Sequence, residues 1–263
     1  MVMRAARSPK ILEYPKNWQQ LVQGELAREE LEKALEPITE RIFGYYLVKI
    51  GSLSSQITLS KCPIKNQYSC APHCNQNNDL CAQSSKLPFQ NNSVDAFVLL
   101  GELDFAQDPH QIIREIDRAI TSDGRIVIAG FNPFSIAGII KYLPINRKNI
   151  LHQGRFFTAS RIKDWLALLN FEVVKQDHLV YSSLFMNDSL NSKSRIQLWF
   201  KKYLPWFSSM YIIEARKREM PLSPIKPAWK LQPKFNVSTA AARQSEVDVS
   251  AAANVHQFVK PDS

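Results

Sequence analysis

The four cysteines of this chain form its densest group of side chains that could bind a metal. Cys62, Cys70, Cys74 and Cys81 fall within one 20-residue window, with His73 among them. A structural zinc site usually carries two pairs of cysteines spaced by two to four residues, and only Cys70 and Cys74 have that spacing. We therefore interpret these side chains as thiols of a reducing compartment, and we expect no metal.

Basic side chains gather in two stretches that contain no carboxylate, Arg125–Lys163 and Ser189–Ser208, and in the second they alternate with aromatic rings. The chain has 33 Lys and Arg against 24 Asp and Glu, a net charge of +9. One interpretation is a solvated basic face whose aromatic residues complete the core. The other is a surface for nucleic acid or an anionic membrane, in which the rings stack on bases or enter headgroups. The second stretch contains Lys193, Arg195, Trp199, Phe200, Lys201, Lys202, Tyr203, Trp206 and Phe207.

Glycine is scarce, which limits the kinds of phosphate site that the chain can build. It has 8 glycines in 263 residues, against roughly 7% in average proteins. Gly51 follows a short apolar run, where it either lets a ligand approach the backbone or only permits a turn. No stretch approaches the ~18 apolar residues of a membrane span, and no apolar segment follows the basic start of the chain. We therefore expect a cytoplasmic protein.

The apolar periodicity predicts alternating strands and helices. Buried strands are expected at residues 44–53, 93–103 and 125–131, and a weaker one at 66–73. Helices are expected around residues 26–42, at 109–121, where Asp108 can cap the start and the Ser122–Gly124 turn ends it, and at 158–170. Residues 171–181 and 209–218 predict a final strand pair. The pattern is typical of an α/β three-layer sandwich with a mostly parallel sheet and a C-terminal antiparallel hairpin.

Composition divides the chain into three parts. Residues 1–40 are predicted to form an N-terminal helical extension, and residues 41–219 the α/β domain. Residues 220–263 hold five of the fifteen prolines and no glycine. Such a composition buries too little apolar surface to offset its ordering entropy, which predicts a disordered tail.

The segment Leu87–Pro133 resembles the class I S-adenosylmethionine-dependent methyltransferases, and among them the small type 11 domains of bacteria. It carries L-P-F, then S-V-D before a strand, D-P before a helix, and R-I-V-I in the next strand. With its flanks, the resemblance extends over about residues 41–218. It implies a Rossmann-like sheet, S-adenosylmethionine as cofactor, and methyl transfer that depends on positioning rather than on a protein nucleophile.

The resemblance also implies which residues hold the cofactor, while the catalytic residues stay unassigned. The turn after the first strand, the loop before L-P-F and the end of the fourth strand are the three parts involved. Gln83 would take the place of an aspartate that binds adenine. The residues implied are Gly51, Ser52, Leu53, Gln83, Ser84, Leu100 and Gly101.

The sequence departs from the family pattern at the acidic positions. Lys49 stands where the family has an acid before the first glycine, and Asp79 is the only carboxylate between Glu40 and Asp95. Two functions follow from this. The first is a methyltransferase acting on a small-molecule or polyanionic acceptor. The alternative is a catalytically inactive relative that binds nucleic acid or a membrane through its basic and aromatic surface.

Three further sites have simple structural interpretations. Asn132, Pro133 and Phe134 are expected to form a turn, with lining of the substrate pocket as the alternative. His110 and His178 are expected to be surface or helix-start residues rather than bases. Gly101 and Glu102 form either a turn on the cofactor side or an ordinary strand exit.

Overall fold

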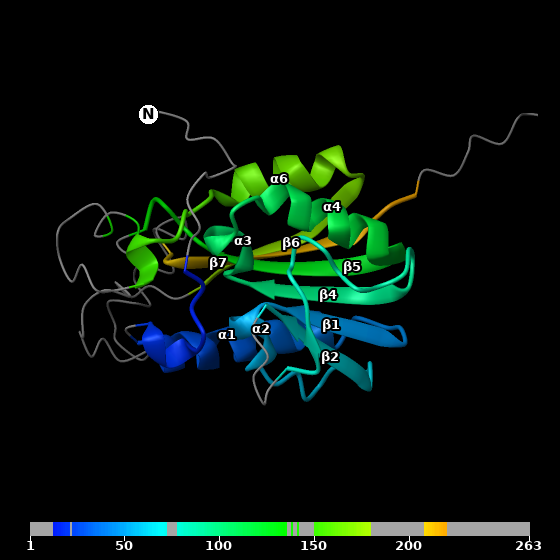
Figure 1. Ribbon diagram of the computed structural model, residues 1–263, viewed down its shortest axis with the longest axis horizontal. Coiled ribbons are helices and arrows are strands. Elements are labelled where there is room, and N and C mark those ends of the chain that lie inside the picture. Colours follow the sequence, from blue (N-terminus) through cyan, green and yellow to red (C-terminus); the bar gives the residue numbers. More distant parts are fainter. Residues whose placement is uncertain are drawn as a thin grey trace, which may run out of the picture. The chain divides into compact units, whose positions relative to one another are not determined.

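A seven-stranded sheet runs through the centre of the structure (Figure 1). The computed structural model describes residues 13–21, 23–72, 78–135, 138, 141, 150–179 and 208–219. These residues lie in the first of two units into which the chain divides, Met1–Pro221 and Leu222–Ser263. The strands are β1 (Tyr46–Ile50), β2 (Asn66–Ala71), β3 (Leu80–Cys81), β4 (Val94–Leu100), β5 (Ile120–Phe131), β6 (Phe171–Leu179) and β7 (Met210–Lys217).

The strand order is β3-β2-β1-β4-β5-β7-β6, which confirms the predicted fold class. Strands β1 to β5 are all parallel to one another, whereas β7 runs antiparallel to both of its neighbours, β5 and β6. The order reverses between β1 and β4, because β1 leads outward to β2 while β4 leads to β5. In open sheets of this kind, ligands bind outside the carboxyl ends of the strands at such a reversal.

Helices cover both faces of the sheet (Figure 1). Helices α1 (Gly24–Thr39) and α2 (Ser52–Ser55) lie on one face, and α4 (Pro109–Ala119) and α6 (Ala159–Leu168) lie on the other. Two apolar cores result, one for each face. Leu31 and Leu35 of α1 are fully buried in the first core together with Leu47 of β1, so α1 packs directly on the sheet.

Local signals explain the two long helices on the second face. Asp108 caps α4, where its Oδ1 accepts the Gln111 N–H at 3.2 Å and Pro109 occupies the first helical position. Thr158 caps α6 in the same way, accepting the Arg161 N–H at 3.3 Å. Asn170 follows α6 with a φ of +60°, a left-handed conformation that asparagine tolerates.

Several predicted boundaries are wrong, and two of them have a clear local reason. The strand expected to continue to Leu103 ends at Leu100, because Gly101 adopts a φ of +68° and the short helix α3 (Glu102–Phe105) begins there. The helix expected to reach the Ser122–Gly124 turn ends at Ala119, since Ile120 already pairs with Val94 as the first residue of β5. The basic cluster from Lys193 to Phe207 and the tail predicted over residues 220–263 lie outside the described residues.

Candidate functional site

Gly51 lies at the carboxyl end of β1, at the reversal of strand order between β1 and β4, and we call this position the crevice. Gly51 has a φ of +94°, and its N–H donates to the Cys70 carbonyl at 2.8 Å. A Cβ placed on Gly51 would lie 2.2 Å from Oε2 of Glu102. The positive φ favours glycine here, and a side chain at this position would also require the Glu102 carboxyl to move.

Glu102 extends from the start of α3 into this crevice. Its side chain is buried, with 4% of the residue exposed, and Oε1 accepts the Ser84 hydroxyl at 2.5 Å. Burial raises the pKa of Glu102 to about 7. Its negative charge in turn helps to raise the pKa of Cys70 and of Tyr14. Among the described residues, no Lys, Arg or His forms an ion pair with this carboxylate.

The predicted cofactor-binding residues lie around this carboxyl, with one exception. Ser52 and Leu53 follow Gly51 in α2, and a Cβ on Gly101 would lie 3.4 Å from Leu53. The Leu100 N–H donates to the Ser54 hydroxyl at 2.8 Å, which ties the end of β4 to α2. Ser84 bonds Glu102 directly. The side chain of Gln83 is exposed, and its place beside adenine stays a prediction.

A second buried carboxyl, Asp104, connects three parts of the fold. Its Oδ2 accepts the Phe131 N–H at 3.0 Å and its Oδ1 accepts the Phe157 N–H at 3.4 Å. Burial raises the pKa of Asp104 to about 8, against the opposing effect of these two hydrogen bonds. The Tyr211 hydroxyl donates nearby to the Phe157 carbonyl at 3.0 Å. Because both oxygens are engaged with backbone, Asp104 fixes α3 against β5 rather than facing a ligand.

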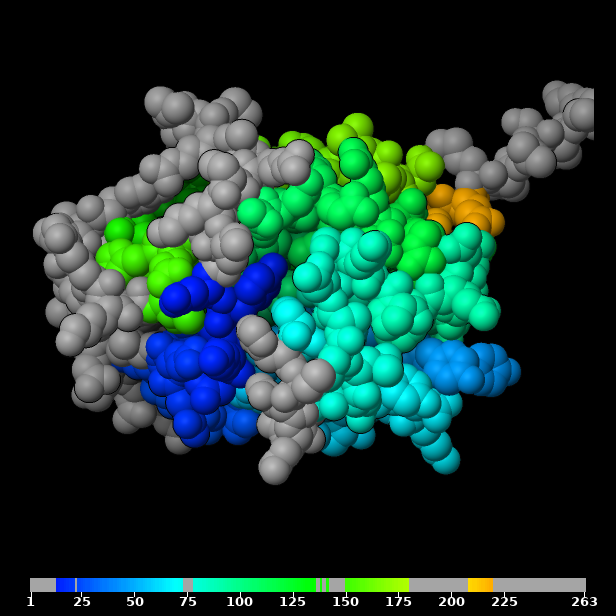
Figure 2. All heavy atoms as spheres, viewed as in Figure 1, coloured from blue at the N-terminus to red at the C-terminus, as the bar shows by residue number. Residues whose placement is uncertain are grey.

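The segment Glu13–Leu21 lies beside the crevice. Trp18, in the short 3-10 helix η1 (Trp18–Gln20), is fully buried and donates its indole N–H to the Leu53 carbonyl at 3.0 Å. Glu13 exchanges two hydrogen bonds with the Gln153 side chain, at 3.0 and 3.3 Å. In Figure 2 the dark-blue N-terminal residues accordingly lie against the bright-green residues that follow β5. The segment therefore connects α2 on one side of the crevice to the loop before α6 on the other.

Sequence reasoning did not identify Tyr14 or Trp18 as site residues, and it named Glu102 only as part of a turn on the cofactor side or an ordinary strand exit. The signal for Glu102 was present, since it is the only glutamate between Val94 and Phe105 and directly follows an apolar run and Gly101. Neither Tyr14 nor Trp18 stands in a recognisable motif. Their position at the crevice depends on the course of the Glu13–Leu21 segment past the carboxyl ends of the strands, which no local pattern predicts.

Lys49, which replaces the expected acid, interacts outside the crevice. Its ammonium donates to the Ile57 carbonyl at 3.2 Å, and burial lowers its pKa. With Gln56, Cys62 and Gln67 it lines a hollow of about 490 Å³ between α2 and β2.

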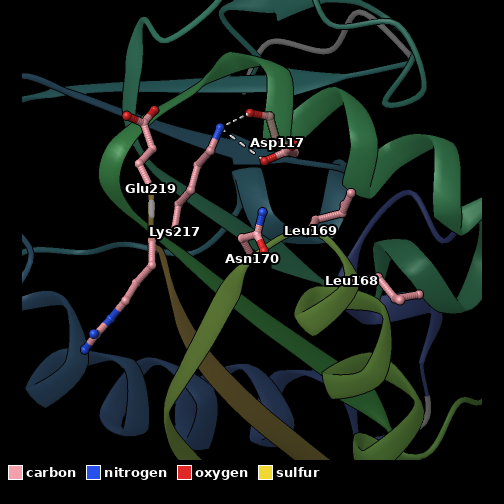
Figure 3. A pocket seen from close by; sticks show the side chains of 7 residues that line it. Asp117, Leu168, Leu169, Asn170, Lys217 and Glu219 are labelled. Atoms are coloured by element: carbon pink, nitrogen blue, oxygen red, sulfur yellow. Dashed lines mark hydrogen bonds and ion pairs between the residues drawn. The ribbon is translucent and has the colours of Figure 1, made fainter. Parts of the chain in front are cut away.

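A hollow of about 470 Å³ lies at the opposite edge of the sheet (Figure 3). Asp117, Leu169, Asn170 and Glu219 line it, and Lys217 reaches across to Asp117. The Lys217 ammonium donates to the Asp117 carbonyl at 2.6 Å and pairs with its carboxylate at 3.1 Å. Because Lys217 and Asp117 neutralise each other, this hollow is a weaker candidate for a ligand-binding site than the crevice.

The remaining polar candidates have structural partners. The Asn132 amide donates to the Ser208 carbonyl at 2.9 Å, and its Oδ1 accepts the Phe134 N–H at 3.1 Å, which forms the expected turn. His110 packs against the Trp165 ring, with centroids 4.3 Å apart. His178 forms a hydrogen bond of 3.0 Å with the Ser208 hydroxyl.

The cysteines differ in state. Cys70 is a buried thiol and Cys62 a half-buried one, but Cys81 is disulfide-bonded, so the expectation of four thiols is wrong there. Within the described ranges, no three His, Cys, Asp or Glu side chains are grouped as a metal site requires. None of the described helices combines the length and hydropathy that crossing a bilayer requires.

The crevice fits a cofactor that carries positive charge. Gly51 has no side chain at the end of β1, and beside it Glu102 provides a buried carboxylate without a cationic partner among the described residues. A carboxylate in such a place favours a cationic ligand, because burial without compensation is costly.

Comparison with known proteins supports the methyltransferase fold that the sequence resemblance implied. Residues 47–128 match the sequence profile of a family described as "Methyltransferase domain". The chain is 35% identical to the protein YafS of Escherichia coli K12 over 246 residues, which cover 92% of this chain and 98% of YafS.

Two solved structures share the fold at low sequence identity. One is an S-adenosylmethionine-dependent methyltransferase of Thermotoga maritima, described as a possible histamine N-methyltransferase. It is 16% identical, covers 74% of this chain and 95% of its own, and has a TM-score of 0.51. The other is the cyclase SpnF, which is 15% identical, covers 82% and 89%, and has a TM-score of 0.52.

Proposed function

Since the chain belongs to the class I S-adenosylmethionine-dependent methyltransferase family, whose cofactor is S-adenosylmethionine, we propose that it methylates a small-molecule acceptor. The crevice between β1 and β4 carries this proposal. There the backbone of Gly51 carries no side chain, and the buried carboxyl of Glu102 lies beside it. It lies where the strand order reverses, which is the usual ligand position in such sheets.

In this proposal the protein acts by holding and orienting its ligands. The bound cofactor supplies a methyl group on a positively charged sulfur, which an acceptor attacks in line. Gly51, Ser52 and Leu53 line one side of the crevice, Leu100 and Gly101 the other, and Ser84 orients Glu102. Such positioning supplies a large part of the rate acceleration without a protein nucleophile.

The N-terminal segment supports a small acceptor over a polymer. Trp18 anchors it to Leu53, and Glu13 connects it to Gln153 across the sheet edge. An acceptor therefore has to approach a crevice beside which the chain's own segment lies, which suits a small molecule better than a duplex or a folded partner.

The alternative is a relative without transferase activity. It is supported by the lysine at position 49 and by the absence of a carboxylate at the end of β2, where Ala71 stands. It is also supported by the Glu102 carboxyl, which fills the space beside Gly51. A nucleic-acid or membrane partner for this alternative stays a prediction from the basic cluster between Lys193 and Phe207.

Two measurements test the proposal. Calorimetric titration with S-adenosylhomocysteine should give a dissociation constant below about 100 μM, within the usual range for enzyme ligands. Labelled methyl groups should then pass from S-adenosylmethionine to compounds in the low-molecular-weight fraction of a cell extract, with Gly51→Val as the control variant. Absence of heat at millimolar ligand would favour the inactive relative, and transfer only to nucleic acid would exclude the small acceptor.

A further inference from the structure

Glu102 lies at the meeting point of four elements that are far apart in the sequence. Gly51 follows β1, Cys70 belongs to β2, Ser84 follows β3, and Tyr14 belongs to the N-terminal segment. The Glu102 carboxyl is adjacent to Gly51, accepts the Ser84 hydroxyl, and acts electrostatically on both Cys70 and Tyr14. Its charge is therefore buried among these elements, at the reversal of strand order.

The other two buried carboxylates of the described residues have partners that account for their burial. Glu214 forms an ion pair with Arg125. Asp104 accepts two backbone N–H groups. Glu102 has one neutral hydroxyl, although burying an ionised carboxylate without compensation is costly. The buried Glu102 carboxylate lowers the stability of the fold. This cost points to a ligand that compensates the negative charge when it binds.

Asp79, the other acid close to this edge in the sequence, is already engaged. Its Oδ2 accepts the Ser69 N–H at 2.7 Å, and its backbone N–H donates to the Ser69 carbonyl at 3.1 Å. The ammonium of Lys49 is directed to the Ile57 carbonyl. Within the part of the chain that the structure describes, Glu102 is thus the carboxylate placed to meet a ligand in the crevice.

S-adenosylmethionine carries two positive charges, a sulfonium and an α-ammonium. We propose that the Glu102 carboxylate is the counter-ion of this cationic part of the cofactor, oriented by the Ser84 hydroxyl. This inference rests on the proposed function and assigns to α3, which follows β4, the acidic role that the sequence lacks at β1 and β2. Glu102 is a binding residue in this role and takes no part in bond making.

The test compares three ligands that differ in charge. S-adenosylmethionine carries both cations, S-adenosylhomocysteine carries the ammonium alone, and 5′-methylthioadenosine carries neither. Glu102→Gln keeps the size of the side chain and removes its charge. It should weaken S-adenosylmethionine binding about tenfold or more in calorimetric titration, and change 5′-methylthioadenosine binding by less than about twofold. Glu115→Gln, which removes a carboxylate of α4 paired with Arg118, should leave all three affinities unchanged.

S-adenosylhomocysteine identifies the charge that Glu102 meets. An equal loss for S-adenosylmethionine and S-adenosylhomocysteine assigns the contact to the ammonium, and a larger loss for S-adenosylmethionine assigns it to the sulfonium. Either result supports the proposal. Ser84→Ala should reproduce part of the loss, because the carboxylate then lacks its orienting hydroxyl.

The pH dependence gives an independent readout in the parent protein. Affinity for S-adenosylmethionine should rise with pH through about 7 as Glu102 ionises, and Glu102→Gln should remove this dependence. The other titratable groups around the carboxyl stay neutral in this range. Burial and the charge of Glu102 raise the pKa of Cys70 to about 11, and they also raise that of Tyr14.

The outcomes separate this inference from the proposed function. If the parent binds S-adenosylmethionine and Glu102→Gln binds it equally well or more tightly, the counter-ion role is refuted while the proposed function stands. If Glu102→Gln weakened 5′-methylthioadenosine binding as much as S-adenosylmethionine binding, the counter-ion role would also be refuted, because the carboxyl would then shape the adenosine site. If the parent binds none of the three ligands, the proposed function fails and this inference fails with it. A melting temperature of Glu102→Gln at or above that of the parent shows that the variant folds.

Discussion

Glu102 should make this protein less stable as the pH rises from about 5 to 8. Its pKa rises from an ordinary 4.5 in the unfolded chain to about 7 in the folded one. Between these values the folded state binds more protons than the unfolded state, so the free energy of unfolding falls with increasing pH. A carboxylate with a depressed pKa would have the opposite effect.

The size of the effect follows from the two pKa values. At about 1.4 kcal/mol for each pH unit, ionising Glu102 in the folded state costs about 3 kcal/mol at pH 8 and less than ~1 kcal/mol at pH 5. Glu102→Gln removes this cost and keeps the side-chain volume. The melting temperature without ligand should therefore rise at pH 8 by roughly 6–12 °C, since 1 kcal/mol corresponds to about 2–4 °C in a domain of this size.

Thermal unfolding at pH 5 and pH 8, followed by circular dichroism, tests this prediction. Glu115→Gln is the matched control: a hydrogen bond from Arg118 lowers the pKa of Glu115, so its removal should reduce stability at pH 8. If Glu102→Gln melts at or below the parent temperature at pH 8, the carboxylate is compensated in the folded protein, and the reasoning from burial is wrong.

Three further substitutions test other parts of the crevice. Gly51→Ala should cost about 1–3 kcal/mol in the free energy of unfolding, and a double-mutant cycle with Glu102→Ala should recover part of it by relieving the clash; full additivity would contradict the contact. Trp18→Phe should cost about 1–3 kcal/mol, because the buried Leu53 carbonyl loses its indole donor; an unchanged melting temperature would show that the N-terminal segment is not anchored there. Asp104→Asn should destabilise by a similar amount in urea unfolding, since an amide offers one acceptor for two backbone N–H groups; a more stable variant would show that the cost of burying the charge dominates.

Local patterns were enough to predict the layers of the fold. The apolar spacing of Ile112, Ile113 and Ile116 and the Asp108 cap predict α4, because helix periodicity and capping depend on neighbours within one turn. The apolar run that forms β4 predicts a strand covered on both faces, which the structure confirms. The resemblance of Leu87–Pro133 to class I methyltransferases likewise rested on contiguous residues in register.

The tertiary structure alone decided where the charge of the crevice comes from. The sequence shows that the expected acids are missing, and it shows a lone glutamate after an apolar run, but nothing local connects the two. Glu102 meets Gly51 and Ser84 because β1 and β4 are neighbours at the reversal of strand order, and its charge acts on Tyr14 because the N-terminal segment lies close by. Interactions between residues 18 to 88 positions apart are set by the packing of whole elements. Sequence periodicity depends only on residues a few positions apart, so it could predict the helices and strands but not the contacts of Glu102.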